Sequence, residues 1–118
     1  MSKVTSLEEL RERLAAFAAA RDWEQFHSPK NLAMALAAEA GELLEHFQWL
    51  TEEQSAALPE TARDEVALEI ADVLLFLLRL ADRLGIDPLQ AGARKLEINA
   101  RKYPVEKSRG RATKYDRL

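Results

Sequence analysis

The sequence predicts an all-α protein, a bundle of four principal helices joined by short connections. Apolar residues recur at three- and four-residue spacing along most of the chain. No stretch shows the alternation of apolar and polar residues that is typical of a strand. The four prolines stand where a helix would begin or end. With 118 residues, 47% hydrophobic and 31% charged, the chain has the length and balance of one globular domain.

The first helix is predicted over residues 7–21. Ser6 and Glu9 have the spacing of a capping box, which satisfies free backbone N–H groups at a helix start. Apolar residues then recur at helical spacing: Leu7, Leu10, Leu14 and Phe17.

The loop "DWEQFHSPKN" leads into the second helix. Ser28 is a natural N-cap and Pro29 suits the first helical position, so this helix is expected to run to about Leu50. Thr51 and Gln54 then have the spacing of a further capping box, which predicts one short helical turn.

The third and fourth helices complete the predicted bundle. The third is expected to start near Glu60 and to stop at Gly85, which suits a left-handed C-terminal cap. Asp87 and Pro88 repeat the pattern of an N-cap followed by proline, and the fourth helix should reach Tyr103, just before a further proline.

Residues 105–118 are predicted to form a basic tail, extended or mobile, after a helical domain over 1–104. From residue 101 onwards, seven Lys and Arg face two acidic residues, so this end carries +5 and residues 1–100 carry −8. A basic tail on an acidic body could bind nucleic acid, or it could meet a small polyanion held on that body.

Composition excludes several classes of protein. There is no cysteine, which excludes disulfides and thiolate metal sites and is compatible with the cytoplasm. The first residues lack the apolar core of a signal peptide. The longest apolar run in the third helix spans only 73–78, whereas a membrane span needs roughly 20 residues. We therefore expect a cytoplasmic protein with no membrane span.

Two pairs of carboxylates lie within apolar helical sequence. Glu39 and Glu42 are three residues apart on the second helix, and Glu69 and Asp72 repeat this spacing on the third. If the two helices pack antiparallel, the pairs face each other and repel. Oxygen ligands suit Mg²⁺, which removes that repulsion and also binds substrate phosphates. Spacing alone leaves open that these acids lie on solvated helix edges.

A di-iron centre of the ferritin type is disfavoured. Such centres need Glu-x-x-His pairs, and neither histidine follows a glutamate by three residues. Glu45 and His46 are assigned to the outer face of the second helix.

The complete pattern resembles a known family. The acidic residues follow the pattern E-x-x-E, then 26 residues, then E-x-x-D. This pattern is similar to the metal signature of the all-α nucleotide pyrophosphohydrolases, the MazG-like group. Within this group, the chain resembles the dCTP pyrophosphatase branch over roughly residues 20–115. The segments that carry the resemblance are "DWEQFHSPKNLAMALAAEAGELLEHFQW", "LEIADVLLFLLRLADRLGID", "KLEINARKYPV" and the terminal "KY". The broader family often has E-E-x-x-E, whereas Ala38 precedes Glu39 here.

This resemblance implies hydrolysis of a nucleoside triphosphate between its α and β phosphates, with dCTP or a modified dCTP as substrate, in nucleotide-pool sanitation. It also implies Mg²⁺, with Mn²⁺ as a substitute. Glu39 and Glu42 are the first candidates to activate water. The implied ligands are Glu39, Glu42, Glu69 and Asp72.

Aromatic residues near the acids are candidates to bind the base. Trp23 and Trp49 flank the second helix; either alone is better explained by core packing, but the resemblance places both in a base pocket. His27 resembles the family's base-side histidine. Phe76 stands where the family commonly has tyrosine, so only stacking is expected there.

Polar residues are candidates to bind phosphates and sugar. Lys30 and Asn31 open the second helix, where backbone N–H groups favour an anion. On the fourth helix and tail, the resemblance suggests Lys95, Asn99, Lys102, Tyr103, Lys114 and Tyr115, although spacing alone makes the helix residues a solvated stripe. We expect Arg79 and Arg83 in surface or interface ion pairs.

The third helix carries leucines on several faces, which one four-helix layer cannot cover, so a homo-oligomer is expected. The resemblance implies a tetramer built as a dimer of dimers, with sites that use more than one chain. Two alternatives remain: a broader NTP or dNTP pyrophosphatase, and a non-enzymatic helical oligomerisation module with a nucleic-acid-binding tail.

Overall fold

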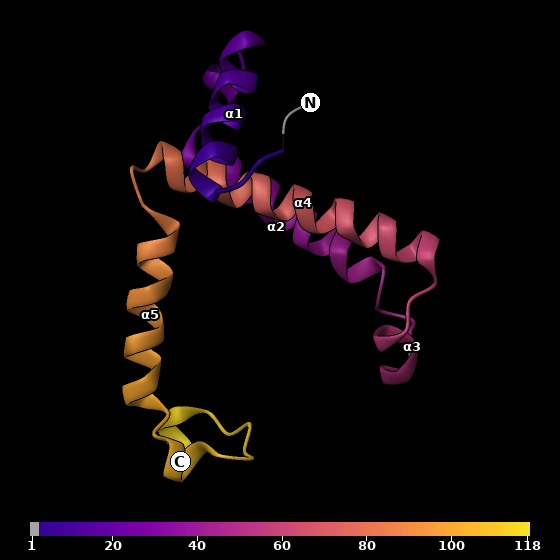
Figure 1. The fold of residues 1–118 in the computed structure, drawn as a ribbon, viewed down its shortest axis with the longest axis vertical. Helices are drawn as coiled ribbons and strands as arrows, with labels where there is room; N and C mark the ends of the chain where they lie inside the picture. The colour runs from indigo at the N-terminus through magenta and orange to yellow at the C-terminus, as the bar shows by residue number, and fades with distance from the viewer. Residues whose placement is uncertain (1–2) are drawn as a thin grey trace. The chain divides into compact units, whose positions relative to one another are not determined.

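The computed structural model describes residues 3–118, which form helices and connecting turns without a strand. The all-α prediction is confirmed. In chain order the elements are α1 (Leu7–Ala20), the 3₁₀ turn η1 (Glu24–Phe26), α2 (Pro29–Glu45), α3 (Glu52–Ala56), α4 (Glu60–Arg83), α5 (Pro88–Lys102), α6 (Val105–Ser108) and the 3₁₀ turn η2 (Tyr115–Arg117) (Figure 1).

The chain divides into two compact units, one ending at Gly85 and one beginning at Ile86. In the first unit, α2 packs along α4 and α1 also packs against α4. The connection through α3 reverses the chain, so α2 and α4 run antiparallel (Figure 1). The two helices that carry the carboxylate pairs therefore lie side by side.

The second unit comprises α5, α6 and η2. Tyr103 and Tyr115 meet edge to face with ring centroids 6.0 Å apart, and Lys102 Nζ lies 4.6 Å from the centroid of the Tyr115 ring. These contacts hold the C-terminal segment against the end of α5.

Local capping chemistry sets most of the helix starts. The side chains of Ser6, Ser28, Thr51 and Asp87 each accept a hydrogen bond from a backbone N–H of the helix that follows. Thr51 forms a complete capping box with Gln54. In α1 the capping box is incomplete, because the Glu9 carboxylate accepts a hydrogen bond from the backbone N–H of Thr5 and not from that of Ser6. Gly85, with φ of +67°, occupies the predicted left-handed position.

Two boundaries differ from prediction. Helix α2 ends at Glu45, because the N–H groups of His46 and Phe47 bond to carbonyls only three residues back and tighten the chain into turns. The C-terminal tail is also not extended throughout. Pro104, with φ of −59°, starts α6, and the contacts of Tyr115 stabilise a further turn.

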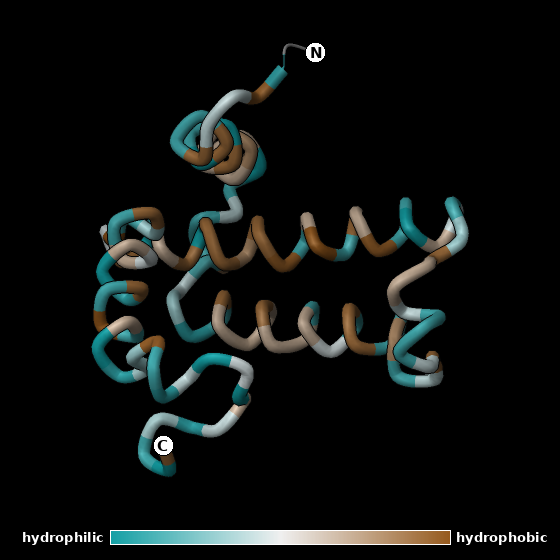
Figure 2. The backbone as a smooth tube through the Cα atoms, turned by 60° about the horizontal axis from the view of Figure 1, so that its bottom comes forward, coloured by the Kyte–Doolittle hydropathy of each residue, from teal (hydrophilic) through white to brown (hydrophobic). Residues whose placement is uncertain are grey.

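Few hydrophobic side chains are buried. In the described part of the chain these are Ala18, Leu32, Val66, Leu78 and Ala81. Hydrophobic residues nevertheless recur along nearly all of α4 (Figure 2). Large ones remain open to solvent, including Trp49 at 86%, Leu68 at 71% and Leu44 at 61% exposure. Among residues 3–118, no helix is long and apolar enough to cross a membrane.

Candidate active site

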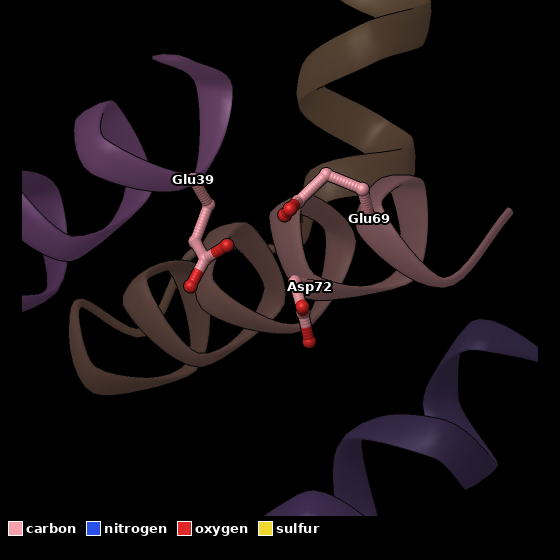
Figure 3. Close-up of side chains that lie close together, drawn as sticks. All are labelled: Glu39, Glu69 and Asp72. Carbon is pink, nitrogen blue, oxygen red and sulfur yellow. The ribbon is translucent and has the colours of Figure 1, made fainter. Parts of the chain in front are cut away.

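Three carboxylates converge between α2 and α4. Glu39 projects from α2, while Glu69 and Asp72 project from α4 one turn apart (Figure 3). One oxygen of each lies within 4.8 Å of one oxygen of the others. The antiparallel packing of two helices, each with three-residue acidic spacing, brings these groups together.

The donor set fits a divalent cation. Within residues 3–118, Glu39 Oε2 and Glu69 Oε2 are buried without a hydrogen-bond partner. A buried carboxylate oxygen without a partner is costly, and a hard cation with oxygen ligands relieves that cost. The acidic cluster is therefore consistent with a metal site.

The cluster accumulates negative charge. The adjacent carboxyl group of Glu69 raises the pKa of Glu39 above its ordinary value. Glu42 is exposed and lies outside the three-residue cluster, but the nearby carboxyl group of Glu39 raises its pKa as well. Raised carboxyl pKa values mean that the negative charges repel one another in the folded chain.

This repulsion predicts that Glu39→Gln raises the melting temperature of the metal-free protein at neutral pH. Below the pKa that Glu39 has in the unfolded chain, the carboxyl is protonated in both states and the repulsion is absent. The repulsion develops as pH rises above that pKa and is complete above the raised pKa of the folded chain. The gain in melting temperature over wild type should therefore shrink as pH falls into the carboxyl range. Thermal unfolding in a chelator measures this difference, with Glu97→Gln, which removes an exposed carboxylate of α5, as control. A variant no more stable than wild type at neutral pH contradicts the prediction.

An aromatic pocket adjoins the acidic cluster. It is a cavity of about 220 Å³, and its walls come from α1, the loop before α2, the start of α2, and α4: Leu14, Phe17, Trp23, His27, Leu32, Asp72, Leu75, Phe76 and Arg79. The Trp23 ring meets the rings of Phe17 and His27 edge to face, at centroid distances of 5.6 and 6.5 Å. Asp72 belongs to both the cluster and the pocket wall.

The structure brings together some of the predicted base-binding residues. Trp23, His27 and Phe76 all line the pocket, but Trp49 does not. The two tryptophans stand beyond opposite ends of α2, whose 17 residues span about 25 Å. Within one chain they do not face the same cavity.

Comparison with known proteins settles the family. A family model described as MazG-like matches residues 34–118. The chain belongs to the MazG-like family. Bovine dCTP pyrophosphatase 1 is 46% identical over 119 residues, covering 99% of this chain and 70% of the bovine protein. The human dCTP pyrophosphatase 1 is 44% identical over 96% of this chain and 68% of its own length.

A solved structure supports the same fold. A crystal structure of a pyrophosphatase from Archaeoglobus fulgidus matches with a TM-score of 0.80 and 43% identity, covering 88% of this chain and 97% of the other. The resemblance seen in the sequence is thereby confirmed, as is the expectation of a MazG-like hydrolase of the pyrophosphatase type.

The remaining predicted residues of this MazG-like chain lie at the start of α2 and in the second unit. Lys30 is exposed, and the side-chain amide of Asn31 donates to the carbonyl of Phe26 at 3.1 Å. The others all belong to the unit that begins at Ile86: Lys95, Asn99, Lys102, Tyr103, Lys114 and Tyr115. Of these, Lys102 and Tyr103 both contact Tyr115, and the backbone carbonyl of Asn99 accepts a hydrogen bond from the backbone N–H of Tyr103.

Arg79 forms an ion pair, as expected, but it is buried within the chain and does not lie on its surface. It is 5% exposed and lines the pocket, and its guanidinium pairs with Asp82 at 3.2 Å. The carboxylate one turn along α4 offsets the burial of the charge. The sequence held a signal for this position, since Asp72, Phe76 and Arg79 have the i, i+4, i+7 spacing of one helix face. Leu14 and Phe17 of α1 also line the pocket, whereas the sequence assigned them only to the packing of the first helix.

Proposed function

We propose that the chain hydrolyses dCTP, or a modified dCTP, between the α and β phosphates to give dCMP and pyrophosphate. The observation that carries the proposal is the position of Asp72, which is shared by the acidic cluster and the aromatic pocket. A base in the pocket and phosphates beside the cluster suit one nucleotide. The identity to proteins named dCTP pyrophosphatase 1 favours dCTP among such nucleotides. The role is nucleotide-pool sanitation in the cytoplasm.

Four carboxylates would hold Mg²⁺, with Mn²⁺ able to replace it: Glu39, Glu42, Glu69 and Asp72. When bound, the cation offsets the negative charge of the triphosphate oxygens. Glu42 or Glu39 accepts a proton from the attacking water, whose oxygen bonds to the α-phosphorus while the bond to the bridging oxygen breaks and pyrophosphate leaves.

The other polar and aromatic residues bind the substrate. Trp23 and Phe76 stack on the base, with His27 at its edge. Lys30 and Asn31 favour an anion at the start of α2. The residues of the second unit bind phosphates and deoxyribose, with Asn99 on the sugar: Lys95, Asn99, Lys102, Tyr103, Lys114 and Tyr115.

The functional form in this proposal is a homotetramer, a dimer of dimers. The outer face of α2 supports it, because Met34 and Leu44 are exposed there beside Gly41. Glycine inside a helix costs about 1 kcal/mol relative to alanine, yet a Cβ on Gly41 would meet nothing within 4 Å in this chain. Close approach of a helix from another copy gives that glycine a purpose.

The deciding experiment follows nucleotide and pyrophosphate release from each dNTP in the presence of Mg²⁺. We expect dCTP to be hydrolysed fastest, with dCMP and pyrophosphate formed in equal amounts. Equal rates for all dNTPs would favour the broader-specificity alternative. Release of inorganic phosphate in place of pyrophosphate, or no release from any dNTP, would overturn the proposal.

A further inference from the structure

Arg79 is held between two partners in the wall of the pocket. Its Nη1 donates to Asp82 Oδ2 at 3.2 Å, and its Nε donates to His27 Nδ1 at 3.1 Å. Asp82 is itself fixed, since its other oxygen accepts from Arg11 Nη1 at 3.0 Å. The carboxylate of Asp82 offsets the charge of the guanidinium, and Arg79 is only 5% exposed. The guanidinium therefore has little freedom to move away from His27.

The bond from Arg79 decides which nitrogen of His27 carries a proton. Arginine has donors only, so Nδ1 must accept, and the single proton of a neutral imidazole is then on Nε2. Burial, together with the charges of Arg79 and Arg83, lowers the pKa of His27 against the opposing charge of Glu24, which favours the neutral ring. None of the hydrogen bonds found in residues 3–118 uses His27 Nε2.

The ring is also fixed in position. Arg83 Nε donates to the backbone carbonyl of His27 at 3.2 Å, so α4 holds this residue at both its backbone and its side chain. The imidazole packs edge to face with Trp23 and lines the pocket. Stacking on aromatic rings accepts any base, whereas a fixed polar group discriminates between base edges.

We propose that Arg79 is a positioning residue that locks His27 as the Nε2–H tautomer, so that the pocket presents a fixed hydrogen-bond donor to an acceptor on the base. This inference rests on the proposed function for the class of ligand, a pyrimidine deoxynucleotide, and deepens it. Cytosine fits, because its O2 and N3 are both acceptors. A base with only a donor at that edge would leave the His27 donor unpaired, which is costly in a pocket.

Long-range proton–nitrogen NMR of the imidazole rings tests the tautomer directly. The chain has two histidines, and His46→Gln assigns the signals of His27. We expect wild-type His27 at neutral pH to be neutral and protonated on Nε2, and added dCMP to shift that nitrogen. A His27 that is protonated on Nδ1 or on both nitrogens, or that does not respond to bound dCMP, overturns the proposal whatever any variant does.

Arg79→Met should release the lock. Its His27 signals should move towards a mixture of tautomers, and KM for dCTP should rise about three- to tenfold, as for loss of one neutral hydrogen bond, with kcat changed less than KM. Arg63→Met is the matched control, since it makes the same change at an exposed position of α4 that has no hydrogen bond to Asp82 or His27 among residues 3–118, and it should leave the His27 signals and KM unchanged. Unchanged tautomer signals in Arg79→Met overturn the proposal.

The two proposals fail in different ways. If no dNTP is hydrolysed, the proposed function falls, while the wild-type spectrum still decides whether Arg79 fixes the tautomer. If dCTP is hydrolysed but His27 carries its proton on Nδ1, only the role of Arg79 falls.

Discussion

Replacing Glu39 with glutamine is expected to lower dCTP hydrolysis by at least about 100-fold, because changes to residues that merely support metal ligands already cost roughly 10- to 100-fold. Glu39 lies inside the acidic cluster, and one of its oxygens is buried without a partner among the described residues. The substitution keeps the size of the side chain and removes its charge. Initial rates across a range of Mg²⁺ concentrations should show both a lower maximum and a higher Mg²⁺ requirement.

Glu45→Gln makes the same chemical change six residues along the chain, on an exposed part of α2 outside the cluster. It should retain the wild-type rate and Mg²⁺ dependence. Equal rates for Glu39→Gln and Glu45→Gln, in proteins of equal helix content by circular dichroism, would remove Glu39 from the metal site.

The parts of the fold that could be predicted depend on local chemistry. An N-cap needs only a short polar side chain and the backbone two or three residues ahead, so Ser28, Thr51 and Asp87 were found from the sequence. The acidic cluster needed one further assumption, the antiparallel packing of two helices with matching spacing. That assumption is correct for α2 and α4.

The parts that could not be predicted depend on tertiary context. An arginine in the last part of a helix is usually solvated. Arg79 can be buried because its guanidinium bonds to Asp82 and His27, and the positions of these partners are set by the tertiary structure. The end of α2 and the short helix α6 have weak local signals, because several turn geometries are close in energy there. The predicted division at residue 104 and the roles of the second-unit residues stay predictions.

The separation of Trp23 and Trp49 leads to the second large expected effect. If both stack on the base, Trp49 must come from another copy, since the 17 residues of α2 lie between them. Trp49→Ala should then weaken catalysis roughly 5- to 150-fold, the effect of losing one stacking aromatic ring. The 86% exposure of Trp49 in the single chain implies little cost in stability to the isolated fold.

Mixed oligomers of Glu39→Gln and Trp49→Ala subunits distinguish a shared site from a site within one chain. In a shared site, a Trp49→Ala subunit keeps Glu39 and Trp23 and receives Trp49 from its Glu39→Gln neighbour. Random pairing across a two-fold interface then leaves about one site in four with every residue intact. Co-expressed subunits carrying two different tags, purified over both, should therefore be more active than either variant alone. A mixture no more active than the average of its parents would place Trp49 outside the site of a neighbouring copy.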